Sequence, residues 1–267
     1  MSVRDAAVAG FFYPADARAL VEEVDRHLAA AAPPTEAIAV VVPHAGYVYS
    51  GPTAGEVLGR VVVPDRVVVV GPKHRAAGAR AAIPAAERWR LPMAKVPVDR
   101  ELADAVARET GAVADDEAHR DEHSLEVQVP FLWRRNPKLA LTPLALGMLD
   151  ADRIAQVGAG LARAARAAGG PVLLVASTDM SHQIPEERAT RLDRLAIDRI
   201  LELDPDGLID VVVERRITMC GVIPTAAVLH AARALGASEA ELVRYTTSGE
   251  ASGDFDRVVG YAGIVIR

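Results

Sequence analysis

The sequence predicts an α/β fold in a single domain, with a central sheet that is mostly parallel. Short apolar runs rich in β-branched residues recur along the chain, and Gly, Pro or Ser bound them, which is typical of buried strands. The three clearest runs are 37–42, 66–70 and 171–176. Segments with apolar residues at helical spacing lie between them, and no linker or change in composition divides residues 1–267.

The other elements follow from residue spacing and from capping residues. Asp16 and Asp150 are suitable N-caps and predict helices that begin directly after them, and His27 on the first helix is expected to face solvent. Further helices are predicted from Ser124 onward and over 53–63, 99–109, 186–203, 205–215 and 222–232. Further strands are predicted over 79–83, 139–146, 241–247 and 258–266, whereas 89–98 has an irregular pattern.

The composition excludes several classes of function. The formal net charge is -6, so we expect no non-specific binding to nucleic acid or to an anionic membrane. The one cysteine, Cys220, excludes an intrachain disulfide and suits a reducing compartment. No run of 18 apolar residues occurs, and the first residues lack the apolar stretch of a secretory signal. We therefore expect a cytoplasmic protein.

Three loops that follow the apolar runs carry most of the functional information. They contain His44, His74 and His182, each a few residues beyond a predicted strand. In an open α/β sheet, ligands bind outside the carboxyl ends of the strands. Because histidine is the most common side chain for metal ligation and for proton transfer near neutral pH, three imidazoles at one sheet edge predict a metal or catalytic site.

Two further residues extend this prediction. Cys220 directly precedes a predicted helix, where the helix dipole favours the thiolate, and a thiolate is a metal ligand. His123 lies where a polar loop runs into an apolar element, so it is either a residue of the site wall or a structural residue. Glu122 and Glu126 are possible hydrogen-bond partners for a metal-bound imidazole.

Together these motifs resemble the Memo family, whose bacterial and archaeal members are often called AmmeMemoRadiSam system protein B. The resemblance covers residues 9–266 and rests on six motifs in the same order: Gly10-Phe11-Phe12-Tyr13-Pro14, Pro43-His44-Ala45-Gly46-Tyr47, Gly71-Pro72-Lys73-His74, Asp121-Glu122-His123-Ser124-Leu125-Glu126, Ser177-Thr178-Asp179-Met180-Ser181-His182 and Met219-Cys220-Gly221.

The resemblance implies a fold, a cofactor and partners. The family is similar in fold to the class III extradiol dioxygenases, which implies a three-layer α/β/α domain. It also implies that iron or copper is held by His44, His74 and Cys220, and that Asp179 and His182 line the pocket. A functional association with AMMECR-type and radical SAM proteins is a further implication.

The residue chemistry agrees with this picture but leaves alternatives open. Two imidazoles and one anionic ligand leave coordination positions free, as in non-heme iron oxygenases, and a thiolate favours copper(I), zinc or a thiolate-bound iron. We expect His182 to act as general acid and base, Asp179 to orient it or to replace Cys220 as ligand, and Tyr47 to donate from the pocket wall. An oxidoreductase acting on a small phenolic substrate is the first hypothesis. A metal-binding protein without turnover, a zinc-dependent hydrolase and a peptide-interaction module remain alternatives.

Overall fold

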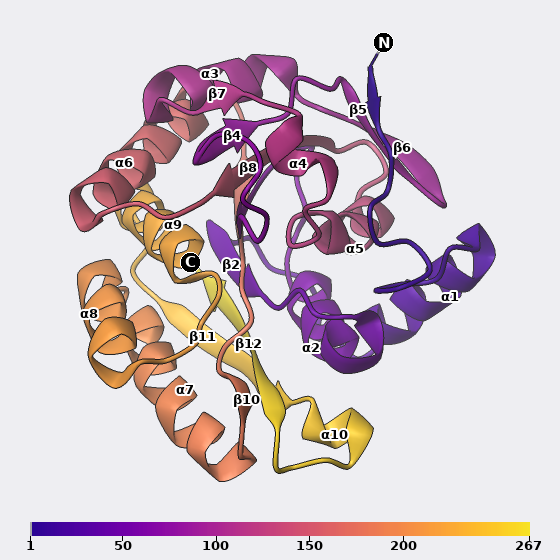
Figure 1. Ribbon diagram of the computed structural model, residues 1–267. Coiled ribbons are helices and arrows are strands. Elements are labelled where there is room, and N and C mark those ends of the chain that lie inside the picture. The colour runs from indigo at the N-terminus through magenta and orange to yellow at the C-terminus, as the bar shows by residue number, and fades with distance from the viewer. Residues whose placement is uncertain (1) are drawn as a thin grey trace.

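The central feature of the computed structural model, which describes residues 2–267, is a mixed sheet flanked by helices (Figure 1). Its four central strands are parallel and lie in the order β2 (Ala39–Val42), β9 (Val172–Ser177), β3 (Arg66–Pro72) and β8 (Ala140–Leu146). They are almost entirely buried and rich in Val, Leu and Ala. The predicted α/β fold is confirmed, and these strands correspond to four of the predicted apolar runs.

Antiparallel strands complete the sheet on both sides. Next to β2 lies β12 (Val258–Ile266), which also pairs with β11 (Ala240–Thr247) and β10 (His182–Ile184). Next to β8 lies β4 (Ala81–Ile83), which is antiparallel to it and parallel to β7 (Val113–Ala114). The parallel arrangement is therefore limited to the centre of the sheet and the β4–β7 pair.

Helices cover both faces of the sheet and produce the three-layer arrangement. One layer contains α1 (Ala17–Leu28), α2 (Tyr47–Gly59) and α5 (Val129–Arg135), on the right in Figure 1. The other contains α3 (Arg100–Thr110), α6 (Ala151–Ala167), α7 (Glu186–Leu201), α8 (Pro205–Arg215) and α9 (Val222–Leu235). Asp16, Asp99 and Asp150 accept hydrogen bonds from the first-turn amides of α1, α3 and α6, which fixes where these helices begin.

The structure corrects the prediction for residues 89–98 and for the start of helix α2. The 89–98 segment is not irregular but forms a hairpin of β5 (Arg88–Leu91) and β6 (Ala94–Pro97), to which β1 (Val3–Arg4) adds. Trp89 alternates with outward-facing arginines and is fully buried, and this alternation is the strand signal. Helix α2 begins at Tyr47 rather than at residue 53 and contains Pro52, whose missing N–H removes only one helical hydrogen bond.

His27 was predicted to face solvent, but the structure largely buries its side chain. Its side chain is 11% exposed and packs on α2, where a Cβ at Gly51 or Gly55 would come within 2.5 Å of His27 atoms. These glycines let α1 and α2 approach closely, so His27 is a packing residue.

The remaining helical turns are short: α4 (Glu117–Arg120), η1 (Glu126–Gln128) and α10 (Gly249–Ser252). The last of them lies in the connection between β11 and β12. None of the helices in the described residues is both long enough and apolar enough to cross a membrane.

Candidate metal centre

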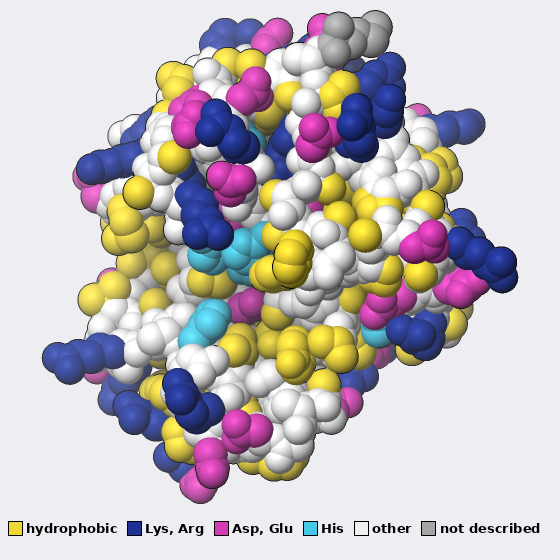
Figure 2. Space-filling view, turned by 45° about the vertical axis from the view of Figure 1, so that its right-hand side comes forward, with side chains coloured by type: hydrophobic (Ala, Val, Ile, Leu, Met, Phe, Trp, Pro, Cys, Tyr) yellow, Lys and Arg dark blue, Asp and Glu magenta, His cyan; other side chains and the backbone are white. Residues whose placement is uncertain are grey.

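The carboxyl ends of the central strands bring the predicted loops to one edge of the sheet. His44 follows β2, His74 follows β3 and Asp179 follows β9, and β9 lies between the other two strands. The Thr178 amide donates to the Val42 carbonyl, which continues the pairing of β2 and β9 beyond the strands. Figure 2 shows histidine side chains gathered in a hollow on this face.

Three imidazoles form a cluster, which we call the imidazole cluster: His44, His74 and His123. One ring nitrogen from each lies within 4.8 Å of the other two. The rings of His74 and His123 stack at 4.5 Å between centroids, and His44 meets both edge-on at 5.3 and 5.5 Å. Because two nitrogens on one ion with bonds of about 2.1 Å are at most about 4.2 Å apart, small side-chain rotations would bring the three to a shared ion.

Hydrogen bonding fixes the tautomer of His44. The Ser177 hydroxyl donates to the Ser124 carbonyl at 2.6 Å, so its oxygen has to accept from its other two neighbours. These are the Gln128 side-chain amide at 3.0 Å and Nδ1 of His44 at 2.9 Å. His44 therefore carries its proton on Nδ1 and leaves an unprotonated Nε2. Burial, followed by the charges of the neighbouring histidines, lowers its pKa well below the usual value, which keeps the ring neutral.

A carboxylate fixes His74 in the same way. Nδ1 of His74 donates to Glu122 Oε1 at 2.9 Å, and the His74 amide donates to the other oxygen at 2.6 Å. Burial alone would raise the pKa of Glu122, but the hydrogen bonds and charge of His74, with the Ser124 amide, lower it to about 2. The ionised Glu122 thus leaves Nε2 of His74 available, which is the arrangement of carboxylate, histidine and metal found in metalloproteins.

Cys220 lies beside His44 in the turn before α9. Its Sγ is 3.2 Å from Nε2 of His44 and 3.2 Å from the Asp179 amide nitrogen. Gly221 allows this approach, because a Cβ there would be 2.5 Å from the Ser177 carbonyl oxygen and from Thr178 Cβ. Burial, with the Asp179 charge, raises the pKa of the thiol and so opposes the effect that the helix dipole was expected to have. A bound cation would be needed to deprotonate it.

The predicted catalytic pair lies next to this cluster. The Thr218 carbonyl accepts from Nδ1 of His182 at 2.9 Å, so Nε2 is the nitrogen without a proton whenever this ring is neutral. Asp179 Oδ1 accepts from the His44 amide at 2.7 Å. Burial raises the pKa of Asp179 to about 6, although this hydrogen bond and the charge of His182 oppose the shift. Asp179 therefore holds the His44 loop, and one of its oxygens is already committed to that role.

A cavity of about 470 Å³ opens beside these residues. His123, Asp179 and His182 line it, together with three aromatic side chains that the sequence analysis did not single out: Phe12, Tyr49 and Tyr261. Tyr47, predicted for this wall, is not among the lining residues, because its hydroxyl donates to the Val127 carbonyl in the core. Tyr261 and Val259 alternate along β12, so the period of two in that strand was the signal that could have identified them.

The Tyr261 hydroxyl is a further polar group of this wall. It makes no hydrogen bond with any residue that the structure describes, and burial, with the charge of Asp179, raises its pKa. It therefore stays protonated and has a hydrogen bond to donate to a molecule in the cavity.

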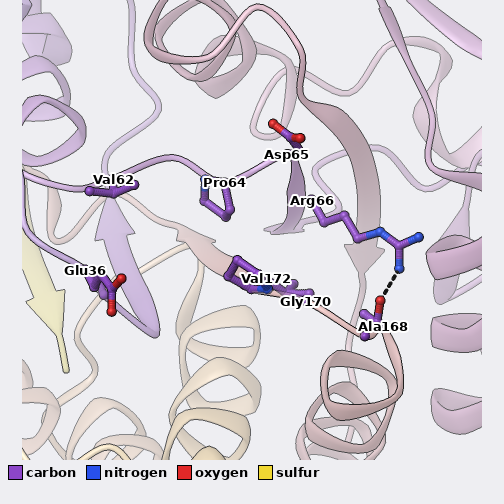
Figure 3. A pocket seen from close by; sticks show the side chains of 11 residues that line it. Glu36, Val62, Pro64, Asp65, Arg66, Ala168, Gly170 and Val172 are labelled. Atoms are coloured by element: carbon purple, nitrogen blue, oxygen red, sulfur yellow. Dashed lines mark hydrogen bonds between the residues drawn. The ribbon is translucent and has the colours of Figure 1, made fainter.

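A second cavity lies at the opposite end of the central strands (Figure 3). It is lined by residues before β3 and β9, including Asp65, Arg66 and Gly170. Arg66 is already committed, because it donates to the Ala168 carbonyl and pairs with Asp99 and Glu101. No histidine or cysteine lines it, so none of the candidate metal ligands lies at this end of the strands.

Known proteins resemble this chain over its whole length. A MEMO1 family protein of Methanopyrus kandleri is 40% identical over 99% of each chain. One from Methanococcoides burtonii is 40% identical over 99% of this chain and all of its own, and one from Aquifex aeolicus is 37% identical over 99% of each.

The fold also matches a solved structure at low identity. An uncharacterized protein from Escherichia coli K12 has a TM-score of 0.59 and 14% identity, over 85% of this chain and 98% of its own. The family model described as Memo-like protein matches residues 4–265, and with the relatives above it places the chain in the Memo-like family.

Proposed function

We propose that this protein binds one redox-active metal ion, iron(II) or copper, through His44, His74 and Cys220, and uses it in an oxidoreductase reaction on a small phenolic substrate. The observation that carries the proposal is the hydrogen-bonded tautomer of both imidazoles. Ser177 and Glu122 each accept from an Nδ1–H, so in both neutral rings Nε2 is the nitrogen whose lone pair can bind a metal ion.

The donor set supports iron or copper over zinc. A structural zinc site usually has four protein ligands and several cysteines, whereas this site offers three imidazoles and one thiol, which lies beside His44. A soft thiolate shifts preference toward copper, and a site with open positions suits iron(II), which would supply binding of a substrate oxygen and of dioxygen when present. His123 is a further candidate ligand, because its ring nitrogen meets those of His44 and His74.

The surrounding residues support proton transfer to and from a hydroxyl substrate. Nε2 of His182 is free to accept a proton, because Thr218 holds its Nδ1–H. The Tyr261 hydroxyl is free to donate to a substrate oxygen. Phe12 and Tyr49 give the cavity aromatic walls, which suit a flat ring.

A second candidate is a metal-binding protein without turnover. It is favoured by Cys220, which stands where an extradiol enzyme has a carboxylate, and by Asp179, one oxygen of which is occupied by the His44 amide. A thiolate next to bound metal is itself open to oxidation, which suits a redox-responsive protein.

Metal content decides between these proposals and the others. Protein purified without a metal-binding tag should contain iron or copper near one equivalent, and His44→Ala and Cys220→Ser should lose it. His230→Gln, a part-buried histidine on α9, is the matched control and should keep the metal. Zinc as the bound metal, or metal retained in both site variants, would refute the proposed site.

Turnover needs a separate measurement. Protein loaded anaerobically with Fe(II) should consume oxygen when a panel of catechols is added, and His182→Gln should slow this without loss of metal. Metal binding with neither oxygen uptake nor a spectral change across the panel would leave the second candidate in place and refute the oxidoreductase.

A further inference from the structure

The outer end of the cavity beside the imidazole cluster carries hydrogen-bond donors that have no role in the proposed metal chemistry. Arg257 lines this end and makes no side-chain hydrogen bond or ion pair with another of the described residues. It is the single Arg or Lys among the lining residues, and it is exposed to solvent. A guanidinium group offers five donors in a planar fork that fits a carboxylate.

The neighbouring polar groups are also hydrogen-bond donors. The Ser248 hydroxyl oxygen accepts from the Val259 amide, and the Ser252 hydroxyl oxygen accepts from the Asp254 amide. Neither hydroxyl donates to a residue that the structure describes, so both hydrogens are available. Asp254 is the one acidic residue here, and it accepts from the Asp256 amide.

Gln183 adds a fourth donor in an unusual backbone conformation. Its φ is 58°, in the left-handed region that non-glycine residues rarely adopt, and the β10–β12 register shifts at this position. Such bulges near functional sites re-aim side chains, and the Gln183 side chain lines the cavity.

The two ends of the cavity differ in burial. Arg257 directly precedes β12, Val259 and Tyr261 lie within this strand, and all three residues line the cavity. Tyr261 is buried and close enough to Asp179 for its charge to act on the phenol, whereas Arg257 is exposed. Tyr261 is therefore at the end near Asp179, and Arg257 is at the end near solvent.

We infer that the cavity binds an aromatic compound with a hydroxyl group at one end and a carboxylate at the other, and that Arg257 selects the carboxylate. This inference rests on the proposed function, which requires the hydroxyl end to face His182 and the metal ligands. Phe12, Tyr49 and Tyr261 enclose the ring between these ends.

The test measures binding as well as turnover. Calorimetric titration should show that dihydroxyphenyl carboxylic acids, with spacers of zero to two methylene groups, bind more tightly than catechol and than their own methyl esters. Arg257→Gln should weaken binding of the preferred acid about tenfold or more and leave catechol and the ester unchanged, because a charge-assisted bond is lost. Arg257→Lys should restore part of the difference.

Arg135→Gln is the matched control. Arg135 is exposed at the end of α5, and its substitution changes the net charge by the same amount as Arg257→Gln. It should bind acid and ester as the wild type does. Equal affinity for acids and esters, equal loss for both in Arg257→Gln, or no detectable binding of any acid would overturn the inference. Tighter binding of a hydroxyphenyl phosphate than of every carboxylic acid would overturn the carboxylate assignment.

The two proposals fail in different ways. A protein that contains no iron or copper but still prefers acids through Arg257 refutes the proposed metal function and leaves this inference standing. A protein that holds iron or copper and consumes oxygen equally with acids and esters supports the proposed metal function and refutes the inference about Arg257.

Discussion

Replacing Ser177 by alanine tests how far the metal site depends on the tautomer of His44. The Ser177 hydroxyl makes three contacts, with the Ser124 carbonyl, the Gln128 amide and Nδ1 of His44, at 2.6, 3.0 and 2.9 Å. The variant leaves a buried carbonyl and the His44 N–H without this partner. Because an unsatisfied buried group costs about 1–3 kcal/mol, we expect the free energy of unfolding to fall by about 2–4 kcal/mol.

The metal affinity of Ser177→Ala should fall as well. Loss of a hydrogen-bond partner behind a metal-binding histidine typically lowers affinity about 10–100-fold, because the ring is no longer held in one tautomer and orientation. Competition with a chromophoric chelator for Cu(I) or Fe(II), under anaerobic conditions, measures this directly. Urea unfolding of the metal-free protein gives the stability change separately.

Ser181→Ala is the matched control for this experiment. Ser181 is also fully buried and lies near the end of the same strand, but its hydroxyl has no hydrogen-bond partner among the described residues. Its removal should change neither stability nor metal affinity appreciably. If Ser177→Ala binds metal as tightly as the wild type, or if both variants lose affinity equally, the tautomer argument is refuted.

Three further predictions follow from buried contacts. Glu126→Gln should lower the free energy of unfolding by about 3–5 kcal/mol in urea titrations, because it leaves the buried Arg4 guanidinium without its ion pair at 2.6 Å. Burial lowers the pKa of His119 from 6.5 to about 4, so the unfolded chain takes up this proton first and stability should fall by roughly 3 kcal/mol between pH 6.5 and 4. His119→Gln should flatten that part of the pH profile. Gly221→Ala should lower metal affinity at least about tenfold in the chelator assay, because its Cβ would displace the Cys220 turn.

Each of these has a control or a contradicting outcome. Glu22→Gln removes an exposed ion pair with Arg18 and should change stability by no more than about 0.5 kcal/mol. An unaltered pH profile in His119→Gln would show that other groups carry the acid sensitivity. Wild-type metal affinity in Gly221→Ala would mean that the turn accommodates the added carbon, contrary to the 2.5 Å contacts.

The central strands and most helices could be predicted because their signals are local. Long valine runs and aspartate caps mark β2, β3, α1 and α6 without reference to the rest of the chain. The β5–β6 hairpin was missed because its strands are four residues long, and only the burial of Trp89 reveals the alternation.

Some residues of the candidate site could be predicted from local sequence, and others could not. His44, His74 and Asp179 follow strands, so their meeting could be predicted from the rule for the carboxyl edge of the sheet. His123 comes from an irregular segment, and its place in the imidazole cluster depends on the buried contacts of Glu122 and Glu126, which sequence spacing does not reveal. The raised pKa of Cys220 depends on burial by the Asp179 loop, and no local pattern contains that information.

The wide separation of the candidate metal donors along the chain bears on when the proposed ion could be acquired. His44, His74, His123 and Cys220 are each at least 30 residues from the next, so no two of these four form a chelating pair in the unfolded polypeptide. Only the assembled sheet brings the four donors together, with the hydrogen bonds to Ser177 and Glu122 behind two of them. Binding of the proposed ion would then follow folding, and the bound ion would add stability in proportion to the logarithm of its free concentration over Kd.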